Sequence, residues 1–159
     1  MKKSSTSAPL TVLCILTLGF IYGCDAISAE EVARLSFEKT ASQEDLNIQS
    51  AELELKAGDK LQIWTEMSME YEGSLGLEYQ LLMIKGADTL AMYQLDPEDK
   101  DVTMGEVKTS FGSETKWRFS GRMTKITIED DGLYIFSSVL AASENPSLKL
   151  KKADLVLKK

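Results

Sequence analysis

From about residue 50 onward, apolar and polar residues alternate along the chain with a period of two. The alternation is clearest over residues 61–71, where Leu61, Ile63 and Met67 fall on one face and Gln62 and Glu66 on the other. This period is typical of β-strands that bury one face. The pattern predicts strands over residues 51–55, 61–71, 75–83, 90–95, 102–111, 115–120, 126–128, 133–140 and 148–157.

Turn-forming residues separate these segments. Asp131-Gly132 is a strong hairpin signal, Asn145-Pro146 turns the chain, and residues 96–101 (DPEDKD) form the clearest loop. Residues 133–140 are apolar on both faces, which predicts a central strand covered on both sides. The expected fold is all-β, a jelly-roll-like antiparallel β-sandwich of about eight to ten strands.

The segment at residues 28–38 allows two interpretations. Ser28 and Glu31 fit a capping box, which predicts a short N-terminal helix. Leu35 and Phe37 alternate with polar neighbours, which predicts a strand. We favour the strand because strands follow it, and the short helix is the alternative.

The first 23 residues have the layout of a secretory signal peptide. Lys2 and Lys3 precede an apolar run over residues 10–21, which is shorter than the roughly 20 residues that cross a bilayer. The run ends in Ile21-Tyr22-Gly23-Cys24, which resembles the lipobox of bacterial lipoproteins, with Tyr22 bulkier than the usual residue. The resemblance implies cleavage before Cys24 and lipid attachment to its thiol.

The expected organisation is therefore a signal peptide at residues 1–23, a lipid-anchored tether at 24–30 and a β-sandwich domain at 31–159. The partner that follows from the lipobox is a membrane, reached through the N-terminal acyl chains. The expected location is the bacterial cell envelope. Because Cys14 lies in the signal and Cys24 is the expected lipid site, we expect no disulfide in the mature domain.

Three stretches add a resemblance at the level of fold. They are residues 57–64 (AGDKLQIW), residues 126–136 (ITIEDDGLYIF) and the final paired strand. The layout resembles small sandwich modules of exported bacterial proteins, such as pre-peptidase C-terminal and GOLD-type domains. The resemblance implies a jelly-roll-like sandwich and assigns no activity.

Composition narrows the chemistry. The formal net charge is −7, which disfavours a nucleic-acid partner, and there is no histidine. Without histidine or a free cysteine in the mature domain, we expect neither common zinc sites nor Ser-His or Cys-His catalysis. We expect no enzyme, no cofactor and no metal.

The acidic loop at 96–101 is interpreted as a solvated turn rather than a calcium site. Glutamates on adjacent strands, Glu66, Glu70, Glu72 and Glu78, are interpreted as a solubilising surface rather than a glycosidase pair.

Aromatic residues are the remaining candidates for ligand contacts. Trp64 falls on the polar face of its strand, and Trp117 lies between Lys116 and Arg118. Exposed aromatic rings stack on sugars or anchor protein partners. The leading interpretation is a non-catalytic envelope lipoprotein that binds another envelope macromolecule or supports an assembly. The alternative is a carbohydrate-binding module, and the candidate ligand-binding residues are Trp64, Tyr71, Tyr79 and Trp117.

Overall fold

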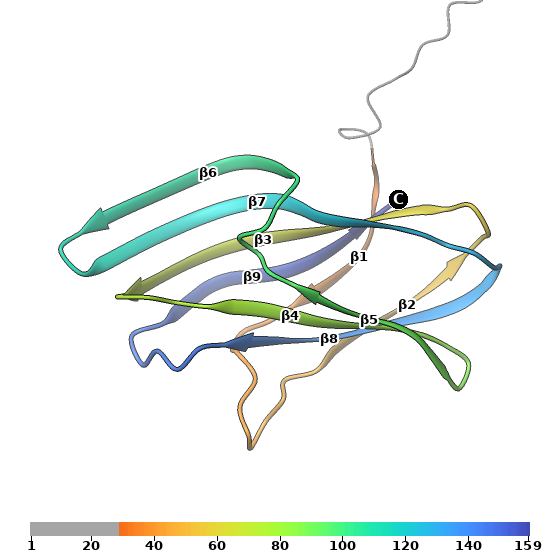
Figure 1. Cartoon of the computed structure of the whole chain (residues 1–159), viewed down its shortest axis with the longest axis horizontal. Helices are drawn as coiled ribbons and strands as arrows, with labels where there is room; N and C mark the ends of the chain where they lie inside the picture. The colour runs from red at the N-terminus through yellow and green to blue at the C-terminus, as the bar shows by residue number, and fades with distance from the viewer. Residues whose placement is uncertain (1–28) are drawn as a thin grey trace, which may run out of the picture.

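The computed structural model of the chain describes residues 29–159 as two antiparallel sheets packed face to face (Figure 1). The predicted all-β antiparallel sandwich is confirmed. Nine strands make up this described part: β1 (Glu31–Ser36), β2 (Gln49–Leu55), β3 (Lys60–Glu72), β4 (Leu77–Lys85), β5 (Asp88–Leu95), β6 (Val102–Phe111), β7 (Glu114–Thr127), β8 (Gly132–Ala142) and β9 (Lys149–Lys158). The expected signal peptide and Cys24 lie outside the described residues.

The two sheets differ in size. The larger has the order β1-β9-β3-β7-β6, and the smaller has the order β2-β8-β4-β5. The strand β3 is the centre of the larger sheet and is hydrogen-bonded to β7 on one side and β9 on the other. The segment with the clearest alternation in the sequence is therefore the strand with the most extensive pairing.

The alternating apolar residues meet between the sheets. Leu61, Ile63 and Met67 of β3 are buried in one core with Tyr79 of β4 and Phe136 of β8. Each of these side chains stands on the inward face of its strand, as a period of two requires. Burial of such side chains is the main stabilising contribution in a sandwich without a disulfide.

Two local predictions are settled by the pairing. Residues 31–36 form β1, so the alternative of a short N-terminal helix is wrong. Residues 115–120 and 126–128, predicted as separate strands, lie largely on the single strand β7, which ends at Thr127. Its pairing with β3 shifts register between Ile63 and Trp64, and this irregularity interrupts the alternation that the sequence prediction relied on.

The strand β8 is central in its sheet but is covered on one face only. Tyr134, Phe136 and Leu140 point into the core. Leu133, on the other face, is 53 % exposed, and Ile135 is only partly buried. The prediction that residues 133–140 are covered on both sides is therefore wrong. Nothing within residues 29–159 covers the outer face of β8, because a two-layer sandwich covers one face of each sheet.

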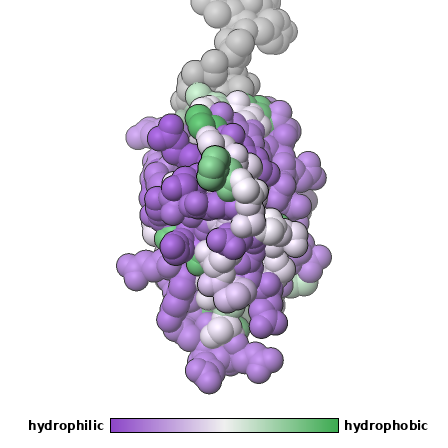
Figure 2. Space-filling model, turned by 90° about the vertical axis from the view of Figure 1, so that its left-hand side faces the viewer, coloured by the Kyte–Doolittle hydropathy of each residue, from purple (hydrophilic) through white to green (hydrophobic). Residues whose placement is uncertain are grey.

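The strand β6 forms an exposed edge of the larger sheet. Among residues 29–159 it is hydrogen-bonded to β7 alone, and Phe111 at its end is 89 % exposed. Figure 2 views the end of the sandwich that carries the β6–β7 turn, and hydrophobic side chains stand out in its upper half among hydrophilic ones. The hairpin thus projects apolar side chains beyond the core.

Candidate functional site

Charged side chains gather on the outward face of the five-stranded sheet, which we call the ionic face. They come from four neighbouring strands, so the pairing register brings together residues that are distant in sequence. The ionic face includes Arg34 of β1, Glu66, Ser68 and Glu70 of β3, Lys116, Arg118 and Arg122 of β7, and Lys151, Lys152, Asp154 and Lys158 of β9.

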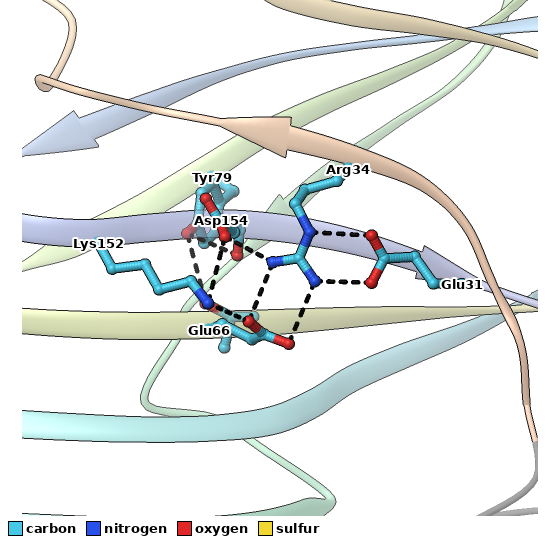
Figure 3. Close-up of polar contacts among 7 residues, drawn as sticks. Glu31, Arg34, Glu66, Tyr79, Lys152 and Asp154 are labelled. Carbon is cyan, nitrogen blue, oxygen red and sulfur yellow. Dashed lines mark hydrogen bonds and ion pairs between the residues drawn. The ribbon is translucent and has the colours of Figure 1, made fainter.

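One arginine joins three carboxylates on the β1 side of this face (Figure 3). Arg34 Nη1 donates to Glu66 Oε2 at 2.9 Å and to Asp154 Oδ2 at 2.5 Å. Its Nε and Nη2 donate to the two carboxylate oxygens of Glu31 at 2.9 and 2.6 Å. Lys152 Nζ donates to Glu66 Oε2 at 2.5 Å. The network ties three strands, β1, β3 and β9, to one another.

The network holds its members in the charged form. The hydrogen bond from Arg34, supported by Lys152, lowers the pKa of Glu66 to about 2 against the opposing effect of burial. Hydrogen bonds to Glu31 and then to Glu66 raise the pKa of Arg34. A general acid needs a carboxyl group that still carries its proton near neutral pH. Glu66 therefore lacks the property that a glycosidase acid requires, and it acts as a structural anion.

The lowered pKa of Glu66 predicts a pH dependence of stability. A carboxylate with a depressed pKa in the folded state stabilises the fold above its unfolded value, near 4.5, and this stabilisation is lost as the pH falls toward about 2. Glu66→Gln should therefore flatten the rise of unfolding free energy with pH between those limits. Urea unfolding at a series of pH values measures the slope. Ser68→Ala, on the same face of β3, should keep the wild-type slope, and equal slopes for Glu66→Gln and wild type would contradict the assignment.

Tyr79 lies beneath this network in the core. Its hydroxyl donates to the backbone carbonyl of Asp154 at 3.3 Å and shares a hydrogen bond of 3.3 Å with Thr65 Oγ1. Burial raises its pKa, so the phenol stays neutral. The side chain joins the two sheets and is not available to a ligand.

Trp64 lies on the ionic face, as its place in the alternation predicts, but is only 2 % exposed. Lys158 Nζ stands 4.5 Å from the centre of its ring. Its Nε1 donates to Gln62 Oε1 at 3.1 Å, and Arg122 Nη1 donates to the same oxygen at 3.3 Å. Long side chains therefore cover the indole on the outer surface.

Trp117 is covered in a similar way on the inward face of β7. It is 5 % exposed, and its Nε1 donates to Glu106 Oε1 at 2.8 Å. Lys108 Nζ lies 3.8 Å from the ring centre, and the Phe119 ring packs at 4.7 Å. Tyr71 is also buried in the core. None of the four candidate aromatic residues presents an open ring face, so the exposed platform considered from the sequence is not formed.

Two adjoining depressions open on the ionic face beside β6. Their volumes are about 250 and 590 Å³, and Ser68 and Arg118 line both. Arg118 is exposed, and no ion pair joins it to another residue in the part of the chain that the structure describes. Both depressions are open to solvent, which suits contact with an extended surface more than enclosure of a small molecule.

The acidic loop before β6 is held by protein contacts. Asp101 pairs with Arg122 Nε at 2.8 Å, and Asp96 Oδ1 accepts from the backbone of Glu98 at 2.7 Å. Among residues 29–159, no group of three or more His, Cys, Asp or Glu side chains is arranged to hold a metal ion. Through Asp101, the loop holds the arginine that donates to Gln62, the residue that also accepts from the indole of Trp64.

A second surface was missed by sequence reasoning. The outward side chains of the four-stranded sheet form an apolar strip, which we call the apolar face. Its members are Leu82 and Ile84 of β4, Met92 of β5, and Leu133, Ile135 and Val139 of β8. The signal in the sequence is the apolar character of residues 133–140 on both faces, a pattern that by itself predicts burial on both sides.

The chain was compared with protein-family models and with curated proteins. No family model matches the chain, and no curated protein matches it. Within the described residues, no helix is long and apolar enough to cross a membrane. The two sheet faces and the N-terminal sequence are therefore the features of this chain that bear on its function.

Proposed function

We propose that the chain is a non-catalytic lipoprotein of the bacterial cell envelope. Its β-sandwich is held at a membrane by acyl chains on Cys24 and binds another macromolecule of the envelope. The observation that carries the binding role is the pair of broad, open sheet faces, one ionic and one apolar. Macromolecular contacts use extended surfaces of this kind, whereas small-molecule sites are concave and enclose most of the ligand.

The chemistry of the ionic face supports a binding role over a catalytic one. Its carboxylates are neutralised by neighbouring cations, as in the pairs of Glu66 with Arg34 and of Glu70 with Lys116 and Lys151. Groups fixed in this way give a surface of defined charge and shape. They are poorly suited to proton transfer, which needs a group that changes its charge during the reaction.

The N-terminal sequence supports the anchoring role. The apolar run at residues 10–21 is followed directly by Ile21-Tyr22-Gly23-Cys24. Two acyl chains attached to one cysteine give stable membrane attachment without a spanning helix. The net charge of −7 gives no electrostatic attraction to an anionic membrane, so the acyl chains would carry the attachment.

Intact-mass analysis of the protein extracted from membranes tests the anchor. We expect a chain that begins at Cys24 and carries added acyl mass. Cys24→Ser should lose the acyl mass and move from the membrane to the soluble fraction. Cys14→Ser, the same change inside the expected signal peptide, should leave the mature mass and the membrane fraction unaltered. A soluble, unmodified mature chain in the wild type would contradict the proposal.

A further inference from the structure

The apolar face is continuous across three strands. Ile84 of β4 lies directly opposite Ile135 of β8, and Leu82 lies opposite Met92 of β5. Directly opposed side chains on one face of an antiparallel pair are in contact range. The pairs therefore form one strip rather than scattered apolar residues.

The strip is open to solvent rather than packed on the core. Met92 is 65 % exposed, and Leu90 beside it in β5 is exposed as well. Leu82, Ile84, Ile135 and Val139 are partly buried, yet none of them belongs to the core cluster or to the residues packed against it. A contiguous exposed apolar strip on a sheet face marks an interaction surface.

Glutamates border the strip on β2. The pairing register places Glu52 opposite Ile135 and Glu54 opposite Leu133. Both glutamates are exposed, and neither has an ion-pair partner within residues 29–159. The ionic face differs in this respect, because Glu66 and Glu70 there are matched with lysine or arginine.

The charges on the apolar face narrow the kinds of partner that could bind it. No lysine or arginine occupies an outward position between the ends of the four strands β2, β8, β4 and β5 in the described chain. A second copy meeting this one face to face would cover the glutamates of β2 without offering cations to match them, and burying an unpaired charge is unfavourable. An anionic membrane surface is disfavoured for the same reason.

We propose that the apolar face binds a partner protein whose contact surface has an apolar centre flanked by lysine or arginine. The centre would pack on Leu82, Met92 and Ile135, and the flanking cations would pair with Glu52 and Glu54. Exposure agrees with this partner, since an open sheet face offers an extended contact surface, whereas a small ligand is usually enclosed in a concave site. The inference rests on the proposed function and names the surface and partner that serve it.

Site-specific photo-crosslinking in cells of the organism that encodes the full chain tests the proposal. The photoreactive residue p-benzoylphenylalanine replaces Leu133 on the apolar face or, as a matched position on the ionic side, Thr109 of β6. We expect a protein adduct from position 133. Its yield should fall at least about tenfold when Glu52→Lys and Glu54→Lys are combined, since hot-spot and charge-pair losses at interfaces reach this size. Glu144→Lys, in the exposed turn after β8, should leave the yield unchanged.

Each other outcome has a defined meaning. Met92→Glu, at an exposed position, should also reduce the adduct, and urea unfolding of every variant shows whether the fold is retained. An adduct with the mass of two copies of this chain, an adduct with lipid, or a yield that ignores charge reversal would overturn the proposal. An adduct from position 109 alone would overturn it and leave the proposed function standing. No adduct from either position would contradict both.

Discussion

Arg34→Ala should lower the free energy of unfolding by about 2–4 kcal/mol, because it leaves a cluster of carboxylates without its main counterion. Asp154 is only 6 % exposed, and of its ion-pair partners in the described part of the chain it would keep Lys152 alone, at 3.6 Å. Removing one member of a buried ion pair is costly since the remaining charge stays desolvated. The expected loss is below that of a fully buried pair because Arg34 and Glu66 are partly in contact with solvent.

Equilibrium urea unfolding measures this loss. Arg118→Ala, which removes an arginine without an ion pair from the same face, should change the stability by no more than about 0.5 kcal/mol. Adding Asp154→Asn to Arg34→Ala should recover part of the loss by removing the stranded charge. If Arg34→Ala and Arg118→Ala have equal effects, the network does not stabilise the sandwich as described.

Gly121→Val should destabilise the fold by about 2–3 kcal/mol, the upper part of the usual range for overpacking. A Cβ atom at this position would lie 2.7 Å from the backbone oxygen of Val102 in β6 and would also collide with the Lys100 side chain. Lys100 Nζ stands 4.1 Å from the centre of the Phe119 ring. The substitution would therefore push both β6 and the Lys100 cover away from the aromatic residues of β7.

Unfolding and tryptophan quenching together test this prediction. In a Trp64→Phe background, Gly121→Val should increase acrylamide quenching of Trp117, because Lys100 is also 5.5 Å from that ring. Gly76→Ala is the matched control, since its Cβ would meet only Ser143 at an ordinary 3.7 Å. Wild-type quenching in Gly121→Val would mean that Lys100 does not cover the ring.

The sequence predicted the strands well where burial is one-sided. Residues 61–71 alternate because one face meets the core, and the structure places β3 there. The bounds of β7 were predicted less well, because polar residues flank the register shift within this strand. The alternation is interrupted around residues 120–125, which made one strand resemble two.

The candidate site was harder to predict because it depends on side chains from distant segments. Trp64 was correctly placed on the polar face, but its burial by Lys158 and Arg122 requires the pairing of β3 with β9 and β7. The clustering of Arg34 with Asp154 likewise requires β1 to lie beside β9. In residues 133–140 the apolar pattern was visible, yet sequence alone does not distinguish a covered face from one that awaits a partner.

The two ends of the described chain meet at one edge of the larger sheet. Glu30 and Lys159 exchange backbone hydrogen bonds of 2.9 and 2.8 Å, and β1 pairs with β9 from there onward (Figure 1). A pull on the N-terminal end would act along the axis of β1 and load the hydrogen bonds of the β1–β9 ladder together, in shear. The Arg34 cross-links act across the same ladder. The strand nearest the expected tether is therefore the one best placed to carry mechanical force.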